Sequence, residues 1–171
     1  RNPPSPGYEF LDEGSFARAY EKDGRVELIV RPFFDLNAYL YKREDPKAQY
    51  DLSRELLILA RQSAPAAARK YIPDIKRERI DIGEVDGFRV AEIVYSMPAY
   101  DEYSFSQKNQ TYLEMIMWST PRKRLVSDTK FPKGLSDALA EIEKIGKSHD
   151  ADFDFVRENF SEYKGTLIIR D

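Results

Sequence analysis

Near the N-terminus, bulky apolar residues alternate with polar ones on both sides of a short Asp-Glu-Gly-Ser sequence, over residues 8–20. Such alternation around a turn is typical of a β-hairpin. A second turn, Lys22-Asp23-Gly24, contains the Asp-Gly pair that favours tight hairpins and leads into the apolar run 25–31. Residues 8–31 therefore predict three antiparallel strands.

A helical pattern comes next and ends before Pro65. The apolar residues that recur at helical spacing are Leu52, Leu56, Leu59 and Ala60. Two extended segments, 79–82 and 88–95, flank an Asp86-Gly87 turn and predict a further hairpin. The order predicted for the first half of the chain is therefore three strands, one helix and two strands.

The second half of the chain has two helical segments, 106–118 and 134–147. The stripe of the second helix consists of Leu135, Ala138, Leu139, Ile142 and Ile145. We expect Trp118 to belong to the core. The lone His149 follows the second helix, where an exposed histidine interacts favourably with the helix dipole. The alternatives are a metal ligand or a base.

Composition restricts the class of protein. The chain has 171 residues, 42% of them hydrophobic, which is enough for one domain with its own core and room for two lobes. The net charge is -3, so no overall basic field predicts direct nucleic-acid binding. Without cysteines, disulfides and Cys-ligated zinc are excluded, and a reducing compartment fits. No apolar run approaches the ~20 residues of a membrane span.

The two ends of the sequence carry their own expectations. The chain starts at Arg1 and not at Met, so we expect a trimmed or processed N-terminus, and no signal peptide is visible. It stops directly after an apolar run, at Asp171, so we expect a natural extension beyond it.

Three acceptor side chains mark the last twenty residues. Asp154 and Asn159 are five residues apart, Asp171 lies twelve residues beyond the asparagine, and Gly165 opens the apolar run 166–169. A loop, a tight turn and a strand would bring the three side chains to one edge of a sheet. Carboxylate and amide oxygens in such an arrangement suit Mg²⁺ and a phosphoryl group. The alternative is a solvated loop with an Asx turn and an edge strand.

The sequence Asp154-Phe-Val-Arg-Glu-Asn159, with an aspartate at the end of the next strand, resembles the catalytic loop and metal-binding aspartate of protein kinases. It is similar to their D-L-K-P-E-N segment. Asp152 and Phe153 stand where kinases usually carry the His and Arg of H-R-D. The resemblance implies that Asp154 orients an acceptor hydroxyl and that Asn159 and Asp171 bind Mg²⁺.

The hairpin at residues 11–20 resembles the kinase loop that covers the phosphates of ATP, L-G-x-G-x-F-G-x-V. Gly14 matches the middle glycine and Phe16 the aromatic tip, whereas Asp12 and Ala17 replace the first and third glycines. The resemblance implies that Gly14, Ser15, Phe16 and Ala17 contact the nucleotide. A carboxylate at position 12 would repel phosphates if it pointed inward, and a simple hairpin is the alternative.

Three more positions extend the resemblance. Arg31 stands where the third kinase strand carries its lysine, and Glu55 stands where helix C carries the glutamate that pairs with it. The resemblance implies that Arg31, positioned by Glu55, contacts the α and β phosphates, and that the backbone at Met97 meets adenine. The alternatives are an exposed strand-end arginine, an exposed helix glutamate, and a Met97-Pro98 pair that only ends an edge strand.

Taken together, these positions imply an α+β, protein-kinase-like, two-lobed fold. Its N-lobe, residues 1–97, would have a five-stranded antiparallel sheet, and its reduced, mainly helical C-lobe would span residues 98–171. The closest resemblance is to the small early-gene Ser/Thr protein kinases of short-tailed bacteriophages. That implies ATP and Mg²⁺ as cofactors, host proteins as partners, damped host transcription, and the bacterial host cytoplasm as the compartment, without membrane or direct nucleic-acid binding.

Two other functions stay open. The substitutions Asp12, Ala17 and Arg31, and the missing His-Arg before Asp154, favour a pseudokinase that inhibits a host protein by binding it. A small-molecule kinase of the aminoglycoside type shares the same Asp-x4-Asn and Asp arrangement. Thermal stabilisation by ATP would separate the pseudokinase from the enzyme, and activity on a soluble alcohol would favour the small-molecule kinase.

Overall fold

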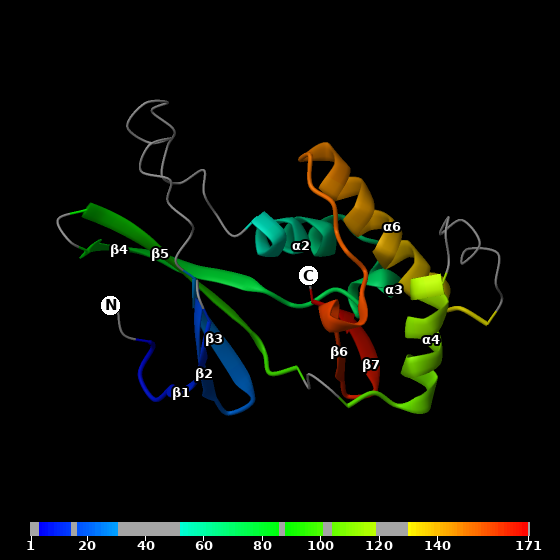
Figure 1. Ribbon diagram of the computed structural model, residues 1–171, viewed down its shortest axis with the longest axis horizontal. Helices are drawn as coiled ribbons and strands as arrows, with labels where there is room; N and C mark the ends of the chain where they lie inside the picture. Colours follow the sequence, from blue (N-terminus) through cyan, green and yellow to red (C-terminus); the bar gives the residue numbers. More distant parts are fainter. Residues whose placement is uncertain are drawn as a thin grey trace. The chain divides into compact units, whose positions relative to one another are not determined.

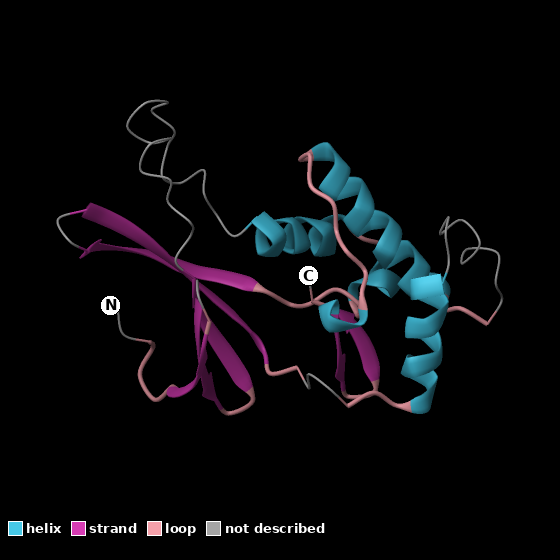
Figure 2. Cartoon of the chain, viewed as in Figure 1, coloured by secondary structure: helices cyan, strands magenta, loops and turns pink. Residues whose placement is uncertain are grey.

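The structure is a computed structural model that describes residues 4–14, 17–30, 52–85, 88–100, 104–118 and 130–170. The chain divides into two compact units, each described below by itself. The first comprises Arg1–Glu55 and Ile75–Ala99, and the second comprises Leu56–Asp74 and Tyr100–Asp171. The first unit contains a five-stranded antiparallel sheet, and the second is mainly helical with a two-stranded hairpin, so the α+β class is confirmed (Figures 1 and 2).

The sheet of the first unit has the strand order β1-β2-β3-β5-β4, with every neighbouring pair antiparallel. Its strands are β1 (Glu9–Glu13), β2 (Ala17–Lys22), β3 (Arg25–Val30), β4 (Lys76–Val85) and β5 (Phe88–Pro98). Strands β4 and β5 are the longest and extend past the other three in Figure 1. The predicted order of three strands, one helix and two strands is confirmed, except that a short second helix follows the first before β4.

The turn between β2 and β3 shows why the Asp-Gly pair predicted a hairpin. Asp23 and Gly24 both have positive φ, 49° and 74°, and the pairing begins directly beside them at Lys22 and Arg25. This left-handed backbone matches the twist of the adjoining strands, and aspartate and glycine adopt it most readily. The sheet is buried at its centre, where Ile29 pairs with Val94.

The helices are α2 (Leu52–Ser63), α3 (Ala66–Arg69), α4 (Gln107–Trp118) and α6 (Lys133–Ser148), and a 3-10 turn, η2 (Arg157–Asn159), leads into the hairpin of β6 (Phe160–Tyr163) and β7 (Thr166–Ile169). The boundary between the two units falls within α2, after Glu55. Both predicted helices of the second half are confirmed, and so is the strand at 166–169. No helix among the described residues is long and apolar enough to cross a membrane.

Helix α6 packs closely against α3. Its predicted stripe is buried at Leu135, Ala138, Leu139 and Ile142. At Gly134, a Cβ atom would lie 2.4 Å from the backbone oxygen of Ala67. Only glycine allows the two helix backbones to approach this closely.

The expectation that Trp118 belongs to the core is wrong. Trp118 is 85% exposed, because the buried side of α4 is formed by Asn109, Leu113 and Ile116 and the last residue of the helix lies away from that side. Leu59 is 40% exposed, and the buried stripe of α2 runs instead through Leu56, Leu57 and Ala60.

A buried amide fixes α4 to the β6–β7 hairpin, which lies beside it in Figure 1. The side chain of Asn109 donates to the carboxylate of Glu162 and to the backbone oxygen of Gly165. The backbone N–H of Ser106 donates to the same carboxylate. Burial alone would raise the pKa of Glu162, but the hydrogen bonds from Ser106 and Asn109 outweigh it and lower the pKa.

Candidate functional site

The loop that carries Asp154 is anchored by its neighbour. Phe155 is buried and contacts the rings of Phe153 and Phe160, at centroid distances of 6.4 and 6.3 Å. Asp154 itself is exposed. The apolar anchor therefore holds the backbone of the loop while the Asp154 side chain stays accessible, which a group that orients a hydroxyl requires.

Asn159 closes this loop onto Asp154. Its side-chain Nδ2 donates to the backbone oxygen of Asp154 at 2.6 Å, and its backbone N–H donates to Val156 at 3.0 Å. A carbonyl can only accept, so the NH₂ group must face Asp154, and the Oδ1 atom is directed elsewhere. That oxygen is suited to Mg²⁺, which binds oxygen ligands.

The hairpin that follows returns the chain to Asn159. Lys164 and Gly165 form its turn with φ values of 49° and 80°, and Phe160 pairs with Ile169. Beyond the strands, the N–H of Arg170 donates to the backbone oxygen of Asn159 at 2.7 Å. The structure therefore brings Asp154, Asn159 and Arg170 together, whereas Asp171 lies outside the described residues.

A second backbone bond ties this hairpin to the helical part of its unit. The N–H of Ile169 donates to the oxygen of Tyr71 at 2.9 Å, in the segment directly after α3. Within the part of the chain that the structure describes, no three His, Cys, Asp or Glu side chains are grouped so as to hold a metal ion. This absence does not concern the predicted Mg²⁺ ligands, because Asn159 carries an amide and Asp171 lies outside the described residues.

In the first unit, Gly14 directly follows β1 and precedes the turn to β2. Its N–H donates to the oxygen of Ala17 at 2.8 Å, and Ser15 and Phe16 lie outside the described residues. A Cβ atom at Gly14 would meet nothing closer than the Ala17 oxygen at 4.0 Å, so the described surroundings do not themselves require glycine. The Asp12 carboxylate accepts the N–H of Glu13 at 2.8 Å and is thereby turned back onto its own strand.

Glu55 in α2 has two described partners. Its Oε1 accepts a hydrogen bond from the buried Tyr95 hydroxyl at 2.9 Å and forms an ion pair with Arg77 at 3.1 Å. The resemblance implied Arg31 as the partner of Glu55, and Arg31 lies outside the described residues. The structure therefore adds Tyr95 and Arg77, which come from β5 and β4 and could not be inferred from local patterns.

Met97 lies within β5 and pairs with Val26 of β3. On the other side, the pairing with β4 ends one residue earlier, at Lys76 and Ser96. Met97 and Pro98 therefore do end a strand, as the alternative had it, but β5 is an interior strand of the sheet and not an edge.

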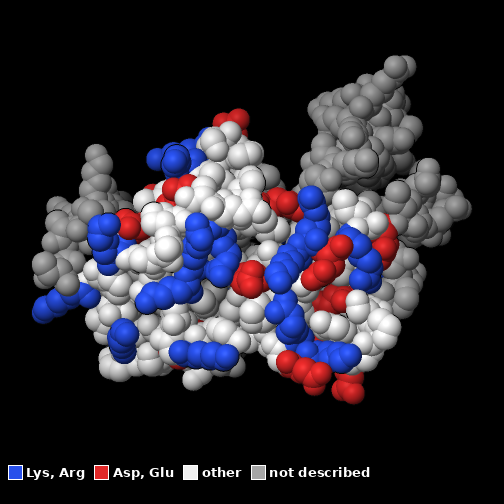
Figure 3. Space-filling view, turned by 180° about the vertical axis from the view of Figure 1, so that it is seen from behind, with Lys and Arg blue, Asp and Glu red and all other residues white. Residues whose placement is uncertain are grey.

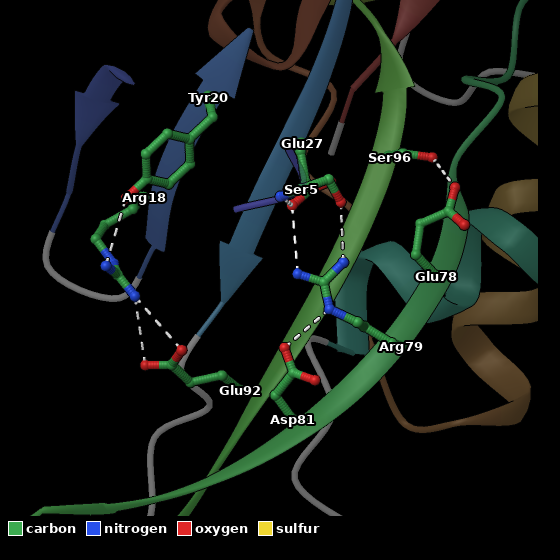
Figure 4. Close-up of polar contacts among 9 residues, drawn as sticks. All are labelled: Ser5, Arg18, Tyr20, Glu27, Glu78, Arg79, Asp81, Glu92 and Ser96. Carbon is green, nitrogen blue, oxygen red and sulfur yellow. Dashed lines mark hydrogen bonds and ion pairs between the residues drawn. The ribbon is translucent and has the colours of Figure 1, made fainter. Parts of the chain in front are cut away.

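One face of this sheet carries a polar cluster that sequence reasoning missed (Figure 4). Arg79 contacts Asp81 at 2.9 Å, Glu27 at 3.5 Å and the hydroxyl of Ser5 at 3.1 Å. Desolvation opposes the charge of Arg79, but the two carboxylates outweigh it and raise the pKa above its ordinary value. The Arg-x-Asp sequence at residues 79–81 could have predicted this ion pair, because residues two apart lie on the same face of a strand.

A second ion pair lies on the same face. Arg18 of β2 contacts Glu92 of β5 at 3.4 Å, and both residues are buried, Glu92 to 2% exposure. Arg18 also donates to the Tyr20 hydroxyl at 3.4 Å. A buried pair of this kind contributes little net stability, but the loss of one partner would be costly. These charges therefore hold strands together, and nothing links them to the predicted transfer chemistry.

Comparison of the chain with protein-family models, with curated proteins and with solved structures gives no match. The case for a function therefore depends on the residues and the geometry described above.

Proposed function

We propose that this protein is an ATP- and Mg²⁺-dependent Ser/Thr protein kinase of the phage type, which phosphorylates host proteins in the bacterial cytoplasm and damps host transcription. The observation that carries the proposal is the closed loop between Asp154 and Asn159, with Arg170 bonded to its far end. This places the residue before Asp171 beside Asn159. A carboxylate, an amide and a strand-end aspartate are the groups that phosphoryl transfer needs.

Each residue has a separate role in this proposal. Asp154 accepts a hydrogen bond from the acceptor hydroxyl and orients it for attack. Asn159, through Oδ1, and Asp171 hold Mg²⁺, which neutralises charge on the phosphates. Gly14, Ser15, Phe16 and Ala17 cover those phosphates.

The proposal also includes the third strand and the helix. Arg31 contacts the α and β phosphates, and Glu55 is the carboxylate that positions it. The bonds that Tyr95 and Arg77 make to Glu55 fix the orientation of that carboxylate.

The sheet gives independent support. Three strands, the helices α2 and α3, and two strands follow one another among the described residues, and the last two strands enter the sheet as β3-β5-β4. Apart from the short α3, a kinase N-lobe has that sequence of elements. Met97 lies one residue past the point where β4 stops pairing with β5, at the position that the resemblance assigns to adenine.

The test is phosphate transfer from labelled ATP to proteins of a bacterial lysate. Asp154→Asn should reduce transfer by about a thousandfold or more, because the hydroxyl loses the group that orients it. Glu158→Gln is the matched control, since it removes an exposed carboxylate from the same loop. Equal rates for the two variants would remove Asp154 from its role, and no transfer by the unaltered protein would refute the proposal.

A binding protein with a kinase-like arrangement is the second candidate. Asp12 and Ala17 favour it because they replace phosphate-loop glycines, and so does Glu55 because it is already engaged by Arg77. Millimolar ATP with Mg²⁺ should raise the unfolding temperature of a kinase and leave that of a pure binding protein unchanged.

A further inference from the structure

Arg157 stands out among the charged residues of the second unit. It lies in η2, three residues after Asp154, and is exposed. Its guanidinium lies over the ring of Phe105, with Cζ 5.2 Å from the ring centroid. Among the described residues, no carboxylate forms an ion pair with it.

This arrangement is suited to binding an anion. A guanidinium held over an aromatic face keeps its N–H donors while losing part of its side-chain freedom. A ligand that binds it therefore loses less entropy than one that must first order a mobile arginine. An oxyanion such as a carboxylate is the best-suited partner, because the N–H groups of Arg157 are all donors and the guanidinium is positively charged.

The local charges restrict where such an anion can bind. Both acidic and basic side chains are present on the face drawn in Figure 3. Within residues 150–159, Arg157 is the sole basic residue beside four acidic ones, Asp150, Asp152, Asp154 and Glu158. An acidic group that approaches this loop is therefore attracted at position 157 and repelled at the others.

The chain geometry limits the distance between Asp154, which would orient the hydroxyl, and Arg157. Three residues separate the Cα atoms of Asp154 and Arg157 by no more than about 11 Å. An extended segment advances about 3.3 Å per residue, so a side chain two or three residues from the hydroxyl falls in that range.

We propose that Arg157, held by Phe105, binds an acidic side chain two or three residues from the phosphorylated hydroxyl, so that the protein selects Ser and Thr with an acidic neighbour. This inference rests on the proposed kinase function and names its substrate class. An exposed ion pair contributes at most ~1 kcal/mol, which corresponds to about a fivefold preference.

The experiment maps phosphorylated residues in a bacterial lysate incubated with the purified protein, ATP and Mg²⁺. The unaltered protein should show an acidic residue enriched about twofold to fivefold at one offset, two or three residues from the site. Arg157→Asp should lose or reverse this enrichment, and Arg157→Lys should retain it because the charge remains. The control is Lys164→Asp, since Lys164 lies over Tyr163 at the same 5.2 Å but in the turn at the opposite end of the hairpin.

The outcomes separate the two proposals. If the unaltered protein phosphorylates nothing, the kinase function fails and the substrate class fails with it. If it phosphorylates sites without acidic enrichment, or if Lys164→Asp abolishes the enrichment as fully as Arg157→Asp, the inference is overturned while the kinase function stands. Should Arg157→Asp unfold, Arg157→Gln removes the charge without adding one, and unchanged specificity in that variant overturns the inference equally.

Discussion

Gly134 provides a test in which two physical effects predict opposite signs. In a helix, replacing glycine by alanine ordinarily stabilises by up to about 1 kcal/mol, because glycine loses more backbone entropy on folding. Here the new Cβ would lie 2.4 Å from the oxygen of Ala67, 3.1 Å from its carbonyl carbon and 3.1 Å from Cε2 of Tyr71. The closest of these atoms belongs to backbone, so a side-chain rotation cannot relieve the contact.

Overpacking of this kind costs about 1–3 kcal/mol, and a backbone clash lies at the upper end of that range. After subtraction of the propensity gain, Gly134→Ala should lower the free energy of unfolding by about 1–2 kcal/mol. For a chain of this length, the unfolding midpoint would fall by roughly 2–8 °C. The effect should extend to the candidate site, because the Tyr71 carbonyl holds Ile169 at the end of β7.

The assay is thermal and urea unfolding followed by circular dichroism. Ala140→Gly is the control, since Ala140 is exposed on the same helix and its replacement tests propensity alone, at a cost of about 1 kcal/mol. Both variants should be less stable than the parent protein. A Gly134→Ala variant more stable than the parent would refute the close approach of α3 and α6.

Two further predictions concern polar side chains of β6. The Ser161 hydroxyl is fully buried and has no hydrogen-bond partner among the described residues. Ser161→Ala should therefore leave the free energy of unfolding, measured with urea, unchanged or raise it by up to about 1 kcal/mol. A clear loss of stability would reveal a partner for the hydroxyl. The folded pKa of Glu162 is lowered, so its contribution is complete above the unfolded pKa, ordinarily 4.5, and is lost as the pH falls through the folded value. Glu162→Gln should therefore be less stable than the parent protein near neutral pH, with a difference in stability that narrows as the pH falls below 4.5; a constant difference in urea titrations at several pH values would contradict this.

The sequence determined the features that depend on neighbours along the chain. Asp23-Gly24 specified a hairpin because its backbone preference is local, and the stripe of α6 followed from helical period. The loop from Asp154 to Asn159 could be predicted for the same reason, since a single bond across five residues closes it.

Only the tertiary structure decided which distant residues meet. Glu55 is bonded to Arg77 and Tyr95, which lie 22 and 40 residues away along the chain. The place of β5 between β3 and β4 depends on register, and the exposure of Trp118 depends on which side of α4 meets the rest of its unit. Periodicity identifies the apolar face of a helix or strand, but long-range packing decides whether another element covers that face and buries its residues.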